Sequence, residues 1–277
     1  MNQLKNTFNM KDIKIYCYWD VSFELKHSKQ IELYVDQVPS SPTPDGTIRF
    51  VALLEPPEII DLSNIALHGL KNKTFDYLLT HNQNLLDSTD KAYLFEFAST
   101  WIRDYNFPEK NFSVSTLVGG KMVAPGHKIR QKIWFKEDKI AVPKNFYLSG
   151  NLGGIENYNN HPILGSDKKP LFDSQFHICI ENAKRENWFT EKLMDCLQTK
   201  TVPIYWGCTN IEKWFDTRGF IIVDEFNDIV NACNSLTPDT YESMLPYIED
   251  NYNRSMEFIE INNRMGNLLK KILEENK

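Results

Sequence analysis

The hydrophobic pattern is clearest over residues 176–207, where an apolar run, a polar stretch, a helical repeat and a second apolar run follow one another. Phe176–Ile180 is short, apolar and β-branched, which is typical of a strand buried in a parallel sheet. Thr190 is a favourable N-cap residue, and apolar residues then recur at helical spacing. Val202–Tyr205 is the next predicted strand, and it ends at Gly207. Such a βαβ unit places its loop and its helix N-terminus at the carboxyl edge of the sheet, where α/β folds bind ligands.

Strand-like and helix-like segments alternate along the rest of the chain. The predicted strands are Ile13–Trp19, Ile48–Leu54, Phe75–Thr80, Ala92–Phe97, Phe112–Val118, Phe146–Leu148 and Phe220–Val223. The predicted helices cover Ile59–Leu70, His127–Lys136 and most of Tyr241–Lys277, with Leu268, Leu269 and Ile272 on one face of the last segment. Leu25–Val38 fits neither pattern clearly, and Gly150–Lys169 has the composition of a long loop.

This alternation predicts two α/β domains that face a cleft. We expect the boundary near Asn106–Lys110, so that residues 1–108 form an N-terminal α/β domain and residues 109–250 a C-terminal domain. The remaining helical segment, 251–277, could pack back on the N-terminal domain.

Composition narrows the possible partners. The chain has 277 residues with 31 Lys and Arg against 37 Asp and Glu, a net charge of −6, which argues against a nucleic-acid partner or an anionic membrane surface. Five scattered cysteines without a C-x-x-C pair are expected to be reduced core thiols. Met1–Lys11 lacks the apolar segment of a secretion signal, and no apolar run is long enough for a transmembrane segment, so we expect a cytoplasmic protein.

The loop after Phe176–Ile180 carries groups suited to a nucleotide. A helix N-terminus offers free N–H groups and partial positive charge to an anion, and Lys192 adds a full charge in the first turn. Glu191 is a carboxylate that suits the hydroxyls of a sugar rather than a phosphate. Taken alone, Glu191 could equally complement the helix dipole and Lys192 could be solvated.

The wider string resembles a known family signature. Glu181 and Asn182, then Trp188–Leu193 with its Thr-Glu-Lys, then Val202–Gly207 are similar to the donor site of the α-1,3-fucosyltransferases, glycosyltransferase family 10. The resemblance covers about Phe176–Phe226, and Ile180 replaces the family's phenylalanine at its start. It implies the GT-B architecture of two Rossmann-like domains and a donor pocket formed by Asn182, Trp188, Glu191 and Lys192.

Two further residues gain a role from the resemblance. Glu55 directly follows the predicted strand Ile48–Leu54 and precedes two prolines. The resemblance implies a catalytic base at this place. Without the resemblance, Glu55 could be an ordinary loop carboxylate. Arg130 corresponds to a family arginine that contacts the donor's diphosphate, a role that suits a guanidinium, and Lys128 is the rival on the same helix.

Metal and cofactor motifs are not evident. Gly119-Gly120-Lys121 lacks the spacing of a Walker motif, the six histidines show no ligand spacing, and no Asp-x-Asp pair occurs. We therefore expect that no metal or other cofactor is required, and that cations and a helix dipole stabilise the leaving group.

The resemblance implies a glycosyltransferase of carbohydrate biosynthesis or protein glycosylation. It would transfer L-fucose from GDP-fucose to a hydroxyl of a glycan acceptor with inversion, with Glu55 as base, Arg130 and Lys192 on the diphosphate, Glu191 on the ribose, and Asn182 and Trp188 shaping the pocket. Two alternatives stay open: a GT-B enzyme that uses another nucleotide sugar, and an inactive module that only binds a sugar nucleotide.

Overall fold

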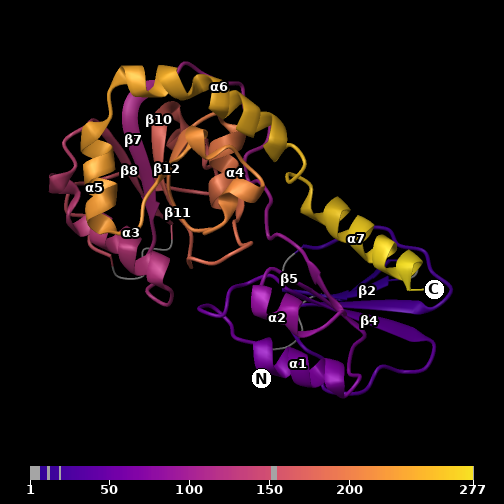
Figure 1. The fold of residues 1–277 in the computed structure, drawn as a ribbon. Helices are drawn as coiled ribbons and strands as arrows, with labels where there is room; N and C mark the ends of the chain where they lie inside the picture. Colours follow the sequence, from indigo (N-terminus) through magenta and orange to yellow (C-terminus); the bar gives the residue numbers. More distant parts are fainter. Residues whose placement is uncertain (1–6, 11–12, 19, 151–154, 277) are drawn as a thin grey trace. The chain divides into compact units, whose positions relative to one another are not determined.

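The chain forms two compact units. The computed structural model describes residues 7–10, 13–18, 20–150 and 155–276. Unit 1 contains the chain up to Phe97, the short segment Glu186–Trp188 and the chain from Glu260 onward; unit 2 contains Ala98–Arg185 and Phe189–Ile259. The structure thus passes from unit 1 to unit 2 about ten residues before the predicted boundary. Each unit is an α/β fold with one sheet (Figure 1).

Unit 1 has a six-stranded sheet whose strands lie in the order of the chain. Strand β1 pairs antiparallel with β2, and every other pair is parallel. The strands are β1 (Thr7–Met10), β2 (Ile13–Tyr16), β3 (Gln30–Val35), β4 (Thr47–Leu53), β5 (Tyr77–Thr80) and β6 (Ala92–Leu94). The helices are α1 (Ser63–Lys71), α2 (Gln83–Ser88) and α7 (Ile261–Glu275).

Helices cover both faces of this sheet, as the side-chain alternation of strands requires. On β4, Phe50 and Ala52 belong to a core shared with α7, whereas Val51 and Leu53 belong to a second core shared with α1. Leu269 and Ile272 of α7 are fully buried in the first core, which confirms the apolar face predicted for this segment.

Unit 2 has a six-stranded, all-parallel sheet in the order β12-β11-β10-β7-β8-β9. The strands are β7 (Asn111–Val118), β8 (Lys144–Ser149), β9 (Ile163–Leu164), β10 (Ser174–Ile180), β11 (Val202–Trp206) and β12 (Ile221–Ile222). The α-helices are α3 (Pro125–Phe135), α4 (Glu191–Gln198), α5 (Phe226–Ser235) and α6 (Pro238–Ser255). Short 3-10 helices are η1 (Glu137–Lys139), η2 (Lys169–Asp173), η3 (Ile211–Lys213) and η4 (Thr217–Gly219).

The strand order of unit 2 reverses between β7 and β10, the first and fourth strands of the unit. The chain leaves β7 for α3, which packs in the core of one face together with α5. It leaves β10 for α4, which packs in the core of the opposite face. The two connections therefore diverge at the carboxyl ends of neighbouring strands, the place where open α/β sheets bind ligands.

Most of the predicted elements are confirmed, with shifts of a few residues at their ends. The ambiguous segment Leu25–Val38 contains β3, and the predicted strand Ile13–Trp19 is β2, which ends at Tyr16. The predicted loop Gly150–Lys169 contains the two-residue strand β9, and residues 151–154 of it lie outside the described residues. Helix α5 was not predicted. All five cysteines are buried, as expected of core thiols.

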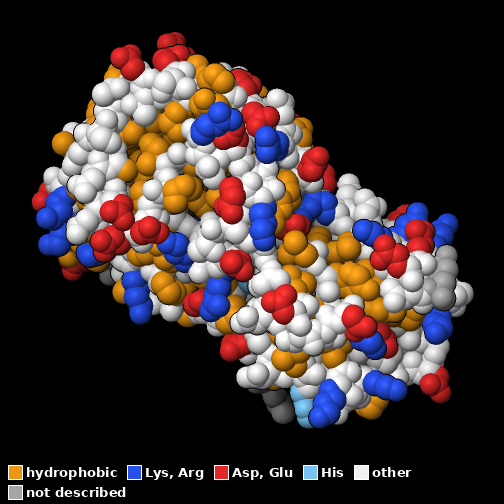
Figure 2. Space-filling view, viewed as in Figure 1, with side chains coloured by type: hydrophobic (Ala, Val, Ile, Leu, Met, Phe, Trp, Pro, Cys, Tyr) orange, Lys and Arg blue, Asp and Glu red, His pale blue; other side chains and the backbone are white. Residues whose placement is uncertain are grey.

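The surface carries mixed charge. Figure 2 shows Lys and Arg side chains interspersed with Asp and Glu over the visible face, without a broad region of one sign. In the part of the chain that the structure describes, no helix combines the length and the apolar character that crossing a bilayer demands.

A buried carboxylate on α4 holds the first residues of unit 2. Asp195 Oδ1 accepts hydrogen bonds from Thr100 Oγ1 at 2.7 Å, from the backbone N of Trp101 at 2.8 Å and from the backbone N of Ile102 at 3.3 Å. These bonds attach residues 100–102 to α4, which explains why unit 2 begins earlier than the composition suggests. Burial raises the pKa of Asp195 to about 7, although the three donors lower it.

The raised pKa makes stability depend on pH in a defined direction. Between an ordinary carboxyl pKa of 3.8 and about 7, the folded protein binds a proton at Asp195 and the unfolded chain does not, so unfolding free energy falls as pH rises. Relative to Asp195→Asn, the wild-type protein should lose up to about 1.4 kcal/mol per pH unit between pH 5 and pH 7. Urea titrations at each pH measure this difference.

Asp216→Asn is the matched control. The Arg218 side chain lowers the pKa of Asp216 to about 2, so this carboxyl is ionised in both states above pH 5 and the variant should follow the wild-type slope. Equal pH slopes for wild-type protein and Asp195→Asn would contradict the assignment.

Candidate active site

The candidate site of unit 2 lies where the strand order reverses. The loop after β7 leads into α3 and the loop after β10 leads into α4, and these two helices carry the predicted residues Arg130, Glu191 and Lys192. The β10 strand ends at Ile180, so Glu181 and Asn182 are the first residues beyond the sheet edge.

Glu181 is the centre of the polar contacts at this edge. It has no exposed surface. Its Oε1 accepts the backbone N–H of Thr190 at 2.8 Å, and its Oε2 accepts the Thr190 hydroxyl at 2.7 Å. Because Thr190 is the N-cap residue of α4, these bonds fix where the helix begins. Burial raises the pKa of Glu181, and the nearby Lys192 and the Thr190 donors partly offset that rise.

Lys192 and Glu191 form an ion pair in the first turn of α4, with 2.9 Å between Lys192 Nζ and Glu191 Oε1. Lys192 Nζ also lies 3.2 Å from Thr190 Oγ1 and 3.7 Å from Glu181 Oε2. Burial lowers the pKa of Lys192, but Glu191 and Glu181 outweigh that effect and raise it. Burial likewise raises the pKa of Glu191, and Lys192 outweighs this and leaves it below its ordinary value. Both groups are therefore charged at neutral pH.

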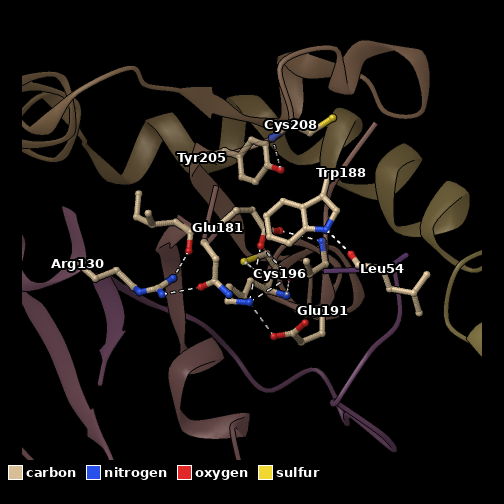
Figure 3. A network of polar contacts seen from close by, with 12 residues as sticks. Leu54, Arg130, Glu181, Trp188, Glu191, Cys196, Tyr205 and Cys208 are labelled. Atoms are coloured by element: carbon tan, nitrogen blue, oxygen red, sulfur yellow. Dashed lines mark hydrogen bonds and ion pairs between the residues drawn. The ribbon is translucent and has the colours of Figure 1, made fainter. Parts of the chain in front are cut away.

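Arg130 on α3 points back at the end of β10. Its Nη1 donates to the carbonyl O of Ile180, and its Nη2 donates to Asn182 Oδ1 at 2.8 Å (Figure 3). Burial lowers the pKa of Arg130, while Glu181 opposes the change. Lys128, the rival on the same helix, is exposed. The structure thus brings Arg130 and Asn182 together, whereas Lys128 faces solvent.

His127 lies close to several positively charged side chains. It lies in the first turn of α3, where its Nδ1 accepts the backbone N–H of Ala124 at 3.0 Å. Its pKa is lowered to about 4, first by burial and then by Arg130, Lys121 and Lys192, which repel the charged ring. Cations from the loop after β7, from α3 and from α4 therefore act on one point of unit 2, as an anion-binding site requires.

Close packing between α3 and the end of β10 depends on glycine. Gly126 donates its backbone N–H to the carbonyl O of Asn182 at 3.0 Å. A Cβ at Gly126 would lie 1.7 Å from the carbonyl O of Glu181. Only glycine lets the first turn of α3 approach the strand end this closely.

Glu55 lies in unit 1, two residues beyond the end of β4, as predicted. It lines a pocket at the carboxyl ends of β3, β4 and β5. Asp36, Ser63, Thr80, His81 and Asn82 supply further polar groups to this pocket. A half-buried carboxylate among hydroxyl, amide and imidazole groups can accept a proton from a bound hydroxyl group.

Trp188 also belongs to unit 1, although Phe189 and the residues after it belong to unit 2. Its side chain has no exposed surface, and its Nε1 donates to the carbonyl O of Leu54 at 3.0 Å (Figure 3). The sequence pattern predicted a loop residue near the nucleotide; the structure shows a buried loop residue that is bonded to unit 1, and its place near the nucleotide stays a prediction.

Three residues of these sites were not singled out from the sequence. Glu181 was noted only as part of the motif, His127 only as part of a helix, and Asp36 was not considered. The signal for Glu181 was its place directly after a buried strand and nine residues before an N-cap threonine. Within the described residues, no three His, Cys, Asp or Glu side chains gather as potential metal ligands; that no cofactor is needed stays a prediction.

Comparison with known proteins agrees with this geometry. Residues 158–249 match the model of glycosyltransferase family 10 (fucosyltransferase), C-terminal part. The matched range contains Asn182, Glu191 and Lys192, whereas Arg130 and Glu55 precede it.

Two curated relatives match shorter parts of the chain. An α-(1,3)-fucosyltransferase of Helicobacter pylori is 34% identical over 62 residues, which are 22% of this chain and 13% of that protein. GDP-fucose protein O-fucosyltransferase 3 of Xenopus tropicalis is 32% identical over 109 residues, 36% of this chain and 21% of that protein. The matches thus span a small part of each relative.

Structural similarity extends beyond the matched residues 158–249. HepE from Anabaena, solved with UDP and glucose, superposes with a TM-score of 0.57 at 14% identity over 81% of this chain and 72% of its own. The fold is therefore that of the GT-B glycosyltransferases, with two Rossmann-like units, as expected from the sequence.

Because Gly126 packs tightly against the end of β10, Gly126→Ala should destabilise the protein. The added Cβ must push α3 away from Glu181, and overpacking of this kind typically costs about 1–3 kcal/mol of unfolding free energy. GDP affinity should fall as well, because Arg130 and Lys121 move with the displaced segment. Urea denaturation and calorimetric GDP titration measure the two effects.

Gly165→Ala is the control, since no atom lies within 4 Å of its added Cβ. Its unfolding free energy should change by less than about 0.5 kcal/mol. If Gly126→Ala were as stable as Gly165→Ala, the close approach of α3 would not be a constraint on this site.

Proposed function

We propose that this protein is an inverting fucosyltransferase that transfers L-fucose from GDP-fucose to a hydroxyl of a glycan acceptor. One observation carries the proposal: Lys192 and Glu191 lie side by side in the capped first turn of α4, inside the stretch that matches the fucosyltransferase family. An ammonium suits the diphosphate of a sugar nucleotide, and a carboxylate suits the ribose hydroxyls.

The donor's diphosphate is held by the charges around His127. Lys192, the N-terminal N–H groups of α4 and Arg130 provide positive charge where negative charge grows on the departing GDP. Asn182 orients Arg130 through its side-chain oxygen. With this much positive charge supplied by the protein, the reaction is proposed to need no metal ion.

The transfer is a single displacement. Glu55 takes the proton of the acceptor hydroxyl, the acceptor oxygen bonds to the anomeric carbon of fucose, and the bond between that carbon and the β-phosphate oxygen breaks. The electron pair of the broken bond leaves with GDP, and the configuration at the anomeric carbon inverts. The proton then passes from Glu55 to solvent.

The names of the two relatives support the sugar more than the acceptor. Both are fucosyltransferases, but one is named for an α-(1,3) linkage and the other for O-fucosylation of proteins. A glycan acceptor is proposed here because the motif over residues 176–207 resembles the donor site of the α-1,3 enzymes. A thermal-shift panel of GDP-fucose and other sugar nucleotides tests the donor, and stabilisation by a different sugar nucleotide alone would contradict it.

Glu55→Gln should reduce turnover to a small residual rate and leave GDP binding intact. The amide keeps the shape of the carboxylate but cannot accept the acceptor's proton, and a missing general base typically costs about 10²–10⁴-fold in rate. Turnover is measured by GDP release with and without acceptor, and GDP affinity by calorimetry. Wild-type turnover in this variant would remove Glu55 as base.

Lys192→Ala and Arg130→Ala should each lower both turnover and GDP affinity. Loss of one charge-stabilising donor typically costs about 10²–10³-fold in turnover, and loss of a charged hydrogen bond about 1.5–3 kcal/mol of binding. Lys128→Ala removes the same charge from the exposed face of α3 and serves as the control. Equal effects of Arg130→Ala and Lys128→Ala would show a general charge effect instead of a contact.

A further inference from the structure

The peptide groups just before the carboxylate of Glu55 are held on two sides. The backbone N–H groups of Leu54 and Glu55 both donate to Asp36 Oδ1, at 2.8 and 3.1 Å. The carbonyl O of Leu54 accepts the indole N–H of Trp188 at 3.0 Å. All four residues belong to unit 1. We refer to Asp36 and Trp188 as the Glu55 clamp.

The clamp supplies hydrogen bonds to Leu54 and Glu55, which lie beyond the last hydrogen bonds between β4 and β5. The pairing of β4 with β5 ends at Leu53, and Pro56 has no N–H group to continue it. Asp36 still donates its own N–H to the carbonyl O of Ala52 at 2.8 Å, then turns with a left-handed φ of 49° that lets its side chain face Leu54 and Glu55. A residue in this conformation indicates that the surrounding contacts determine it.

Trp188 is itself firmly placed. Its ring is buried and lies 5.9 Å from the ring of His81, centroid to centroid. The preceding residue, Asn187, has a left-handed φ of 58° and donates its side-chain N–H to Gln83 Oε1 at 2.9 Å and to the carbonyl O of His81 at 3.3 Å. The segment Glu186–Trp188 is therefore fixed on the same carboxyl edge of the unit 1 sheet that carries Glu55.

We propose that Asp36 and Trp188 are positioning residues for Glu55. By fixing the peptide groups of Leu54 and Glu55, they fix the backbone from which the Glu55 carboxylate reaches the acceptor hydroxyl. Trp188 then acts on the reaction through Glu55 and not by contact with the donor, although it lies within the donor-site motif. The inference rests on the proposed function, in which Glu55 is the base.

Small displacements of a base are costly, since a misplacement of about 1 Å can lower a rate about 10²-fold. Trp188→Phe keeps most of the ring and removes the N–H donor. At saturating acceptor it should lower kcat about tenfold or more, while the KM for GDP-fucose and the affinity for GDP change less than about twofold. Calorimetric stoichiometry of GDP binding shows whether all of the protein is folded, so that a lower kcat is not a lower active fraction.

Asp36 offers a second, independent pair of variants. Asp36→Ala removes the acceptor of both N–H groups and should lower kcat to a similar extent. Asp36→Asn keeps an oxygen that can accept both bonds and should retain most of the wild-type kcat. Burial raises the pKa of Asp36, so an uncharged acceptor suits this environment.

The control variant is Trp134→Phe. Trp134 donates its indole N–H to the carbonyl O of Glu156 at 3.1 Å in unit 2 and is also buried, so the substitution removes the same kind of bond. It should lower stability without lowering kcat.

The double variant with Trp188→Phe and Glu55→Gln tests directly whether Trp188 acts through Glu55. If Trp188 acts through Glu55, the second substitution should not lower the residual rate of Glu55→Gln further. A further tenfold loss there would overturn the proposal, as would weaker GDP-fucose binding with an unchanged kcat, which would place Trp188 on the donor. Wild-type kcat in Trp188→Phe and Asp36→Ala would overturn the clamp and leave Glu55 as base. Wild-type turnover in Glu55→Gln would instead overturn the base itself.

Discussion

The buried carboxylate of Glu181 and the two hydrogen bonds that it accepts from Thr190 hold the candidate donor site together. Removing a carboxylate from water costs several kcal/mol, and here the cost is offset by two short hydrogen bonds and by the ammonium of Lys192. The raised pKa of Glu181 shows that the offset is incomplete. The buried carboxylate is tolerated because it fixes the N-cap residue Thr190 and thereby the N-terminus of α4.

The backbone around Glu181 performs a second task. The carbonyl groups of Ile180 and Asn182 accept hydrogen bonds from Arg130 and from Gly126, both on α3. Three consecutive residues therefore fasten the helices that leave the sheet on opposite faces. The strand order separates the two connections, and residues 180–182 hold Arg130 and Lys192 close to the point where the connections diverge.

In unit 1, buried side chains likewise hold a loop that carries a candidate functional residue, Glu55. Its pocket also lies at the carboxyl edge of a parallel sheet, but the group of interest, Glu55, stands on a turn where the sheet's own hydrogen bonds have ended. Side chains replace those bonds: Asp36 accepts from the N–H groups and Trp188 donates to the carbonyl. In both units a loop carries the chemistry, and buried polar side chains give that loop the rigidity of the sheet.

Local sequence determined a large part of this protein. Period-2 and period-3.6 patterns located most of the strands and helices, although β1, α2 and α5 were not predicted. The N-cap threonine marked where α4 begins, and two prolines marked the end of the strand that leads to Glu55. The motif from Phe176 to Gly207 led to the fold and to the family resemblance, because its residues are close in sequence and their chemistry depends on local geometry.

The tertiary structure decided the contacts between residues that are distant in the sequence. Trp188 is buried beside Leu54, 134 positions earlier in the chain, and Asp195 reaches Thr100 across 95 positions. Neither contact leaves a local pattern, because a hydrogen bond between distant residues is set by the packing of whole elements and not by the spacing of neighbours.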